Sequence, residues 1–185
     1  MAQVLRPSST VTLDAGWAIV GAGTAHAALS DSSDASYCET GTEGDVMEVG
    51  LQAGGAPPVG GLHRLWARTR RFGASAAPVT IDFSVRSGGA LAATRSHAQP
   101  SGVGFAWYSW DLTLAEAALI GNYADLRIRS VDTQTVGAVT HRIAEQYMEL
   151  DDPDPGTPPA NVIGERMAVQ SGKRRPRVQA EGVAP

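Results

Sequence analysis

The most regular feature of the chain is the alternation of apolar and polar residues along short segments. Between Ala124 and Asp132, Leu126 and Ile128 alternate with arginines. A side-chain period of two is what a β-strand needs when one face of its sheet is buried and the other faces water. The sequence therefore predicts a half-buried strand here.

The same pattern predicts further strands along the chain. It recurs in 45–51 and 79–85, and shorter apolar runs extend the set of expected strands to 17–20, 25–29, 36–40, 91–96 and 139–150. Residues 1–9 are expected to form an extended arm or edge strand, because Arg6-Pro7 disfavours a helix. The positions that we predict to lie in the core are Trp17, Ile81, Phe83, Leu126, Ile128 and Met148.

Helical patterns are scarce, and the clearest one lies within residues 113–122, after the aromatic stretch Phe105–Trp110. Thr113 is a suitable N-cap, Glu116 stands at the third helical position, and Gly121-Asn122 ends the segment. Many short strands joined by turn residues, with one short helix, are typical of a β-sandwich. We therefore predict an all-β fold: an antiparallel, jelly-roll-like β-sandwich with one short helix and an extended C-terminal arm.

The composition changes abruptly at Asp151, and this change predicts the domain organisation. We assign residues 1–150 to the β-sandwich domain, 151–160 to a Pro-rich linker, and 161–185 to an extended basic arm. The arm has few apolar residues and should order only on a partner. Its basic cluster, expected to bind an acidic groove on that partner, is Lys173, Arg174, Arg175 and Arg177. The alternative is a solvated, protease-sensitive terminus.

Charge and composition argue against several classes of protein. A net charge of −4 over 185 residues argues against nucleic acid as the main partner. Cys38 is the single cysteine, so we expect no intrachain disulfide, and a small buried side chain there. The first residues do not resemble a signal peptide, and no apolar segment has the length of a membrane span. We expect a soluble protein made in a reducing compartment, with no membrane partner.

One segment, Ala18–Leu29, is similar to a dinucleotide-binding loop. Gly21 and Gly23 occupy the first two glycine positions of G-x-G-x-x-G, but His26 occupies the third, where close helix–strand packing excludes an imidazole. The acidic turn at 31–34 also shortens any following helix. We therefore interpret the segment as a glycine-rich hairpin loop and predict no bound cofactor.

Motifs for metal binding and catalysis are weak. The run 31–36 offers oxygen ligands for calcium but lacks the glycine and distal glutamate of an EF-hand, so a turn with side-chain-to-backbone hydrogen bonds is favoured. The four histidines show no metal-ligand spacing, and no serine lies in a G-x-S-x-G elbow. We assign no catalytic residue, no metal site and no enzymatic activity.

A candidate binding face comes from Leu62–Phe72. As a helix, this segment would align its arginines at intervals of three and four; we prefer a strand because glycine-rich turns flank it. The strand places Arg64, Trp66, Arg68 and Arg70 on one face, which could bind a glycan or an acidic partner. Trp107, Tyr108 and Trp110 could form a similar platform, although packing in the core is the favoured interpretation.

Several segments together resemble small virion proteins of tailed bacteriophages, of the minor tail or head-decoration type. In order they are LRPSSTV near the start, Gly16-Trp17, ALSDSSDASYCET (28–40), LHRLWARTRR (62–71), YADLRIRSVDT (123–133) and EQYMELD (145–151). Cys38 departs from the aliphatic residue usual in such proteins, and the C-terminal extension has no counterpart. The resemblance implies a jelly-roll sandwich with a non-catalytic role in the particle, in head or tail.

From this resemblance we expect a structural virion component, made in the host cytoplasm. It would dock on other virion proteins, and on copies of itself as a homo-oligomer, through its terminal arms. The alternative is a carbohydrate-binding jelly-roll module that adsorbs to host-surface glycans.

Overall fold

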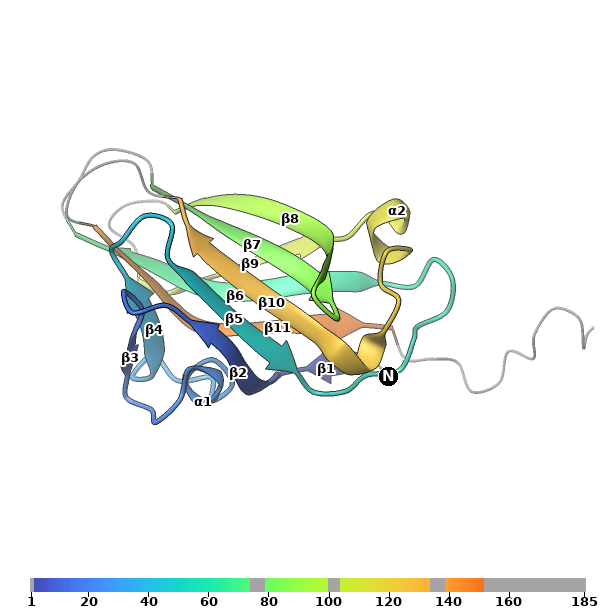
Figure 1. The fold of residues 1–185 in the computed structure, drawn as a ribbon, viewed down its shortest axis with the longest axis horizontal. Coiled ribbons are helices and arrows are strands. Elements are labelled where there is room, and N and C mark those ends of the chain that lie inside the picture. Colours follow the sequence, from blue (N-terminus) through green and yellow to red (C-terminus); the bar gives the residue numbers. More distant parts are fainter. Residues whose placement is uncertain (1, 74–78, 100–103, 134–138, 152–185) are drawn as a thin grey trace, which may run out of the picture. The chain divides into compact units, whose positions relative to one another are not determined.

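The computed structural model describes residues 2–73, 79–99, 104–133 and 139–151 (Figure 1). The strands in this part are β1 (Gln3–Leu5), β2 (Pro7–Leu13), β3 (Ala18–Val20), β4 (Tyr37–Thr40), β5 (Val46–Leu51), β6 (His63–Phe72), β7 (Val79–Ser87), β8 (Ala90–Gln99), β9 (Ala106–Asp111), β10 (Leu126–Asp132) and β11 (Thr140–Leu150). The helices are α1 (Ala25–Ala28), α2 (Leu114–Ala117) and the 3-10 turn η1 (Tyr123–Asp125). In the described ranges no helix is long and apolar enough to cross a membrane.

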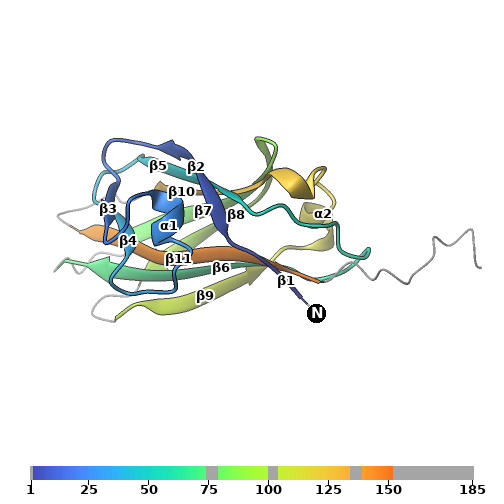
Figure 2. The same ribbon diagram turned by 90° about the horizontal axis from the view of Figure 1, so that it is seen from below.

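The strands form two antiparallel sheets that face each other, as the two views of the ribbon show (Figures 1 and 2). The six-stranded sheet has the order β3-β4-β11-β6-β9, with β1 also beside β11, and the five-stranded sheet has the order β2-β5-β10-β7-β8. Apart from the β3–β4 and β7–β8 pairs, strands that follow each other in the sequence lie in opposite sheets. The predicted jelly-roll-like β-sandwich is confirmed.

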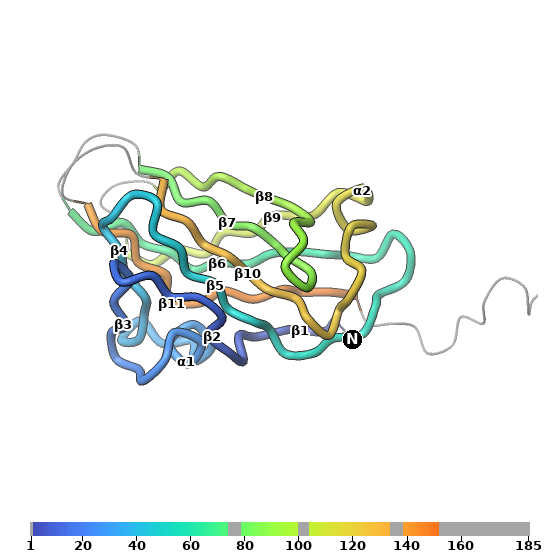
Figure 3. The backbone as a smooth tube through the Cα atoms, in the orientation of Figure 1, coloured from blue at the N-terminus to red at the C-terminus, as the bar shows by residue number. Residues whose placement is uncertain are grey.

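The N-terminal segment joins the two sheets. β1 pairs with residues 148–150 of β11, whereas β2 pairs with β5 in the other sheet. The backbone changes sheets at Arg6, and Figure 3 follows this passage. Pro7 begins β2, a position where the missing N–H of proline costs little. The expected extended N-terminal segment is therefore a pair of strands at a corner of the sandwich.

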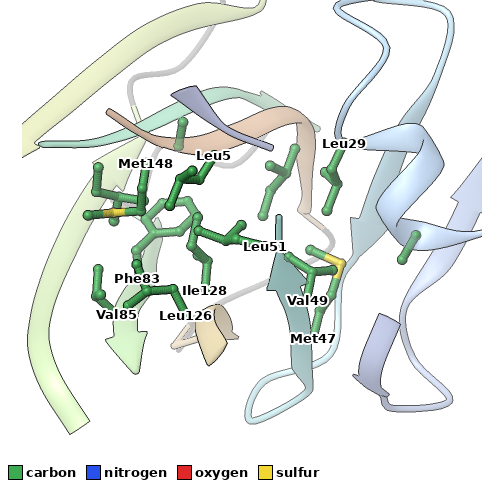
Figure 4. Close-up of a cluster of buried hydrophobic side chains, with 14 of the residues drawn as sticks. Leu5, Leu29, Met47, Val49, Leu51, Phe83, Val85, Leu126, Ile128 and Met148 are labelled. Carbon is green, nitrogen blue, oxygen red and sulfur yellow. The ribbon is translucent and has the colours of Figure 1, made fainter. Parts of the chain in front are cut away.

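The core lies between the sheets, and Figure 4 shows part of it. The inward side chains of β5, β7 and β10 from one sheet and of β6 and β11 from the other belong to one hydrophobic cluster. All six residues predicted for the core are buried, Trp17 being the most accessible at 4%. Cys38 is also fully buried, and burial raises the pKa of its thiol to about 12.

Residues 25–29 were predicted to form a strand, and this prediction is wrong. They form α1, whose N-cap Thr24 accepts a hydrogen bond from the backbone N–H of Ala27 at 3.3 Å. A capping threonine followed by alanines, the best helix formers, explains the helix. Ala25 and Ala28 pack into the core. The glycine-rich segment before them is therefore a strand-to-helix connection and not a hairpin loop.

The predicted helix within 113–122 is present but shorter. Thr113 caps α2 and forms a capping box with Glu116, as the sequence indicated, but the helix ends at Ala117. The segment from α2 through η1 carries the chain from β9 in the six-stranded sheet to β10 in the five-stranded sheet. Arg95 of β8 holds α2 through two 2.6 Å bonds to the Glu116 carboxylate. These bonds, with those from Thr113, lower the pKa of Glu116 to about 2.

Except for Asp151, the predicted linker and the basic arm lie outside the described residues. Asp151 is the last residue described, so 152–160 and the arm 161–185 with Lys173, Arg174, Arg175 and Arg177 keep the status of predictions.

Candidate functional site

The strand β6 presents the candidate binding face predicted from the sequence. Its residues alternate strictly in burial from His63 to Arg70, with Leu65, Ala67 and Thr69 buried. The outward side chains are those of Arg64, Trp66, Arg68 and Arg70. The strand interpretation of Leu62–Phe72 and its division into two faces are confirmed.

Three aromatic rings from neighbouring strands meet on this outer face, and we call them the ring cluster: Trp66 of β6, Trp107 of β9 and Tyr147 of β11. The centroid of Trp66 lies 6.0 Å from that of Trp107, edge to face, and 6.1 Å from that of Tyr147, nearly parallel. Trp107 and Tyr147 are 5.7 Å apart. Trp107 is 43% exposed and the other two rings are half-buried. The cluster therefore offers a partly solvated aromatic surface.

Paired arginines flank the ring cluster. The Arg64 guanidinium lies 5.7 Å from the centre of the Trp66 ring. It donates hydrogen bonds to both carboxylate oxygens of Asp111, at 2.5 and 3.1 Å. These bonds lower the pKa of Asp111. Arg68 lies 5.8 Å from the Trp107 ring and forms an ion pair with Asp34. Because both arginines form ion pairs with aspartates, the face is polar and aromatic without being strongly basic.

A buried carboxylate lies beside the ring cluster on β11. Glu145 of β11 is 1% exposed and accepts hydrogen bonds from Arg6 and, at 3.0 Å, from the Ser32 hydroxyl. Arg6 also lies 5.4 Å from the Tyr147 ring. Burial, together with the nearby charge of Glu145, raises the pKa of Tyr147. The Trp66 indole N–H donates to Glu149 at 2.8 Å, which fixes the orientation of its ring.

Arg70 belongs to a different part of the face. Its guanidinium lies over Phe72, 5.7 Å from the ring, at the far end of β6. Arg142 of β11 also covers Phe72, at 4.1 Å, and pairs with Glu39 at 2.8 Å. The four predicted residues therefore do not make one site: Trp66 belongs to the ring cluster, Arg64 and Arg68 flank it, and Arg70 lies apart from it.

The aromatic residues of β9 divide between the two faces. The favoured interpretation, packing in the core, is right for Trp110, which packs against the core with its ring centroid 5.4 Å from that of Phe83. Tyr108 is half-buried on the same face of β9, and its ring centroid lies 3.9 Å from that of buried His97. The interpretation is wrong for Trp107, which joins the outer cluster. Sequence reasoning missed Tyr147. Its signal was the period of two in β11, where it alternates with buried residues.

The glycine-rich segment has a structural explanation. Gly21 adopts a φ of 75°, and a Cβ there would lie 2.2 Å from the carbonyl oxygen of Ala35. The glycine is therefore required by the close approach of two backbone segments. In the acidic run that follows, the Asp31 carboxylate accepts from the N–H of Ser33 at 2.9 Å, so the predicted turn with side-chain-to-backbone bonds is confirmed.

A polar group of residues lies inside the sandwich at one end. His141 contacts Gln99 at 2.8 Å and Asp132 at 3.3 Å, and His97 lies 3.4 Å from Thr69. Burial lowers the pKa of His97 to about 4. His141 and Asp132 are fully buried, so their contact with each other holds the sheets together and does not face a cleft. Within the described ranges, no three His, Cys, Asp or Glu side chains are arranged to hold a metal ion.

Comparisons with known proteins bear on the fold alone. No protein-family model matches the sequence, and neither does any curated protein. Among solved structures, the chain is similar to the CBM22-1 xylan-binding domain of Paenibacillus barcinonensis Xyn10C, with 10% identity over 82% of this chain and 96% of that one and a TM-score of 0.44. It is also similar to the MgGH51 α-L-arabinofuranosidase, with 11% identity over 80% of this chain and 26% of that one and a TM-score of 0.43. A third similar structure is TmCBM61 bound to β-1,4-galactotriose, with 13% identity over 82% of this chain and 84% of that one and a TM-score of 0.31. Similarities this distant carry no inference about a ligand.

Proposed function

We propose that this chain is a non-catalytic structural component of a tailed-bacteriophage virion that docks on other proteins of the particle. The proposal starts from the ordered succession of segments that resembles such virion proteins. It adds a contact surface, the ring cluster with Arg64 and Arg68. The terminal arms are a further predicted contact.

The observation that carries the docking role is a cluster of partly exposed aromatic rings on the outer face of a sheet. Aromatic residues and arginine are enriched in the cores of protein interfaces, where they supply much of the binding energy. Trp107 is the most accessible ring of the cluster, and Trp66 is held in place by Glu149. Rings that are already oriented lose little conformational freedom on binding, which favours tight docking.

The resembling segments supply structural contacts. Arg6 of the first segment binds Glu145 of the last, and Arg127 of YADLRIRSVDT binds Asp125 at 2.9 and 3.0 Å. Trp17 of the Gly-Trp pair is buried. These contacts give residues of the resembling segments structural roles in this chain, and the place of the protein in a particle has to be tested directly.

The direct test is incorporation into particles. Particles assembled with wild-type chain, with Trp107→Ala and with Ser109→Ala would be purified and the copy number of the chain measured. Ser109 is an exposed neighbour on the same strand and serves as the matched control. We expect the tryptophan variant to fall at least fivefold in copy number while Ser109→Ala remains at the wild-type level. Wild-type incorporation of both variants would remove the ring cluster from the docking surface, and absence of the wild-type chain from particles would end the virion proposal.

Carbohydrate binding is the second candidate, and the same rings favour it. Trp66 and Tyr147 are nearly parallel, at 24°, and aromatic faces of this kind stack against the apolar faces of sugar rings. A glycan array probed with wild-type and Trp107→Ala protein separates the two functions. Saturable binding of one glycan class, lost in the variant, supports the second candidate; absence of binding by the wild-type chain excludes it for the glycans tested.

A further inference from the structure

An apolar pocket lies at the end of the sandwich that carries α2, away from the ring cluster. Its volume is about 280 Å³, and its walls are the 57–60 loop, α2 and the segment that follows α2. The apolar lining residues are Pro57, Pro58, Val59, Leu114, Ala117, Ala118 and Ile120. Val59 is fully exposed and Leu114 is 69% exposed, so the rim is apolar as well. Exposed apolar surface around a concave site is typical of a contact with another protein.

The loop that walls the pocket is held at both ends. Gly55 and the Gln3 side chain exchange two hydrogen bonds, at 2.9 and 3.1 Å, and the N–H of Leu62 donates to Asp151 at 2.8 Å. Between these anchors, the N–H of Gly61 donates to the carbonyl of Pro58 at 2.8 Å, and Gly60 has a φ of 82°. This is the geometry of a type II turn, which places Val59 at its tip. The pocket is therefore preformed.

Two polar side chains, His63 and Tyr123, lie among the described lining residues, and they contact each other. His63 Nδ1 lies 2.9 Å from the carbonyl oxygen of Gly61, which can only accept, so this nitrogen carries the proton. In the neutral imidazole Nε2 is then an acceptor, and the Tyr123 hydroxyl 2.7 Å away donates to it. The hydroxyl oxygen of Tyr123 keeps its lone pairs. The two polar side chains of the pocket, with a neutral imidazole, therefore accept a hydrogen bond and have no proton to give.

We propose that this pocket is a docking site for a tyrosine side chain of a partner protein, whose phenol O–H donates to Tyr123. The volume is at the lower limit of pockets for free ligands, about 300–1,000 Å³, and suits one side-chain ring. The apolar walls match the ring, and the acceptor matches the phenol. The partner's backbone would pass over Val59 and Leu114. The existence of a partner protein rests on the proposed docking function, but the pocket and the ring cluster are separate surfaces.

Other occupants fit less well. A sugar ring carries several hydroxyls, and burying them against proline, leucine and alanine would leave most without partners, at a cost for each. A phenylalanine ring would fill the same space but leave the Tyr123 acceptor unpaired. The Tyr123 acceptor among apolar side chains favours a ring with one donor, and the small volume favours a phenol over the larger indole.

The test uses blocked amino acids as probes of the full-length chain at pH 8. N-acetyl-L-tyrosinamide, its phenylalanine analogue and its tryptophan analogue would be titrated and binding followed by NMR chemical-shift changes. We expect the tyrosine probe to bind about fivefold to tenfold more tightly than the phenylalanine probe, as one net hydrogen bond predicts. Tyr123→Phe should reduce the affinity for the tyrosine probe to that for phenylalanine.

Steric variants check the location. Ala117→Phe or Ala118→Phe, which fill the pocket, should abolish binding of all probes, and Ala115→Phe on the exposed side of α2 should not. Trp107→Ala should leave tyrosine binding unchanged, so failure of the virion proposal and failure of this one are distinguishable. The inference would be overturned if the tyrosine probe did not bind, or if it bound no more tightly than the phenylalanine probe. It would also be overturned if the tryptophan probe bound more tightly than the tyrosine probe, or if binding survived in both filled-pocket variants.

Discussion

The guanidinium of Arg6 donates to the carboxylate of Glu145, a residue 139 positions further along the chain and almost completely buried. Arg6 stands at the point where the chain passes from one sheet to the other, and Glu145 follows the irregularity in the pairing of β11 with β6. The pair therefore joins the N-terminal corner of the sandwich to the strand that carries Tyr147.

Removal of Arg6 should destabilise the fold. Arg6→Ala leaves the Glu145 carboxylate buried with a weaker set of partners, and we expect a loss of about 1–3 kcal/mol in the free energy of unfolding. The Arg6 side chain is 36% exposed, which keeps the loss below that of a fully buried pair. Urea denaturation monitored by tryptophan fluorescence measures it.

Two controls separate this buried pair from ordinary surface pairs. Arg64→Ala breaks an ion pair with Asp111, whose side chain is 57% exposed, and should cost less than about 1 kcal/mol. Adding Glu145→Gln to Arg6→Ala should recover part of the loss, because a neutral amide is cheaper to bury than a carboxylate. An Arg6→Ala cost no larger than that of Arg64→Ala would contradict this account.

Truncation of core side chains tests the assignment of strand faces. Ile81→Ala and Leu126→Ala each remove a side chain that is at most 1% exposed, and each should cost about 2–5 kcal/mol. Leu91→Ala is the control, since Leu91 is 53% exposed and should lose less than about 1 kcal/mol. Chemical denaturation gives all three values, and losses below half a kilocalorie at both core sites would mean that the faces are misassigned.

Acid should weaken the fold through His97. Because its pKa is lowered to about 4 in the folded state, the unfolded chain binds a proton more readily between pH 6.5 and 4. The stability that neutral His97 provides is present above pH 6.5 and is lost as the pH falls through this window, by about 1–3 kcal/mol.

The variant His97→Leu should flatten the dependence of stability on pH over this window. His26→Gln, which leaves the ring contacts of His97 with Tyr108 and Trp110 intact, should keep the wild-type dependence. Denaturation midpoints at half-unit steps from pH 7 to 4 compare the three proteins, and an unchanged slope in His97→Leu would assign the effect to other groups.

The two glycines of the segment that resembles a dinucleotide loop should respond differently to substitution. In Gly21→Ala the new Cβ would lie 2.2 Å from the carbonyl oxygen of Ala35, and the backbone φ of 75° disfavours alanine. We therefore expect the free energy of unfolding to fall by about 2 kcal/mol or more. Gly23→Ala has no neighbour within 4 Å and should change stability by less than about 1 kcal/mol. Thermal denaturation compares them, and equal effects would reject the close-approach explanation.

The C-terminal boundary of the β-sandwich domain can be located by truncating the chain. Asp151 exchanges hydrogen bonds with Leu62, at 2.8 Å through its carboxylate and at 3.1 Å through its N–H. A chain ending after Asp151 should keep the melting temperature of the full chain, because the predicted arm has too few apolar residues to add to the core. A chain ending after Leu150 should lose about 1 kcal/mol. A large loss in both would place part of 152–185 within the folded unit.

The sequence by itself determined the clearest strands and their faces, although it assigned the residues of α1 to a strand. In β10, β6 and β7 the period of two is a local property of a pleated strand, so Leu126, Trp66 and Ile81 could be assigned to their faces without knowledge of any neighbour. The capping box of α2 is local too, since Thr113 and Glu116 are separated by one helical turn. The all-β class followed from these signals.

Only the tertiary structure decided which strands are neighbours, because pairing depends on contacts between residues far apart in the sequence. Trp66, Trp107 and Tyr147 become one cluster because β9 and β11 flank β6, and none of the three is distinctive by itself. Glu145 is buried because Arg6 and Ser32 reach it from other segments. The pocket of His63 and Tyr123 likewise requires a loop, a helix and a strand end to meet, and no local periodicity encodes that meeting.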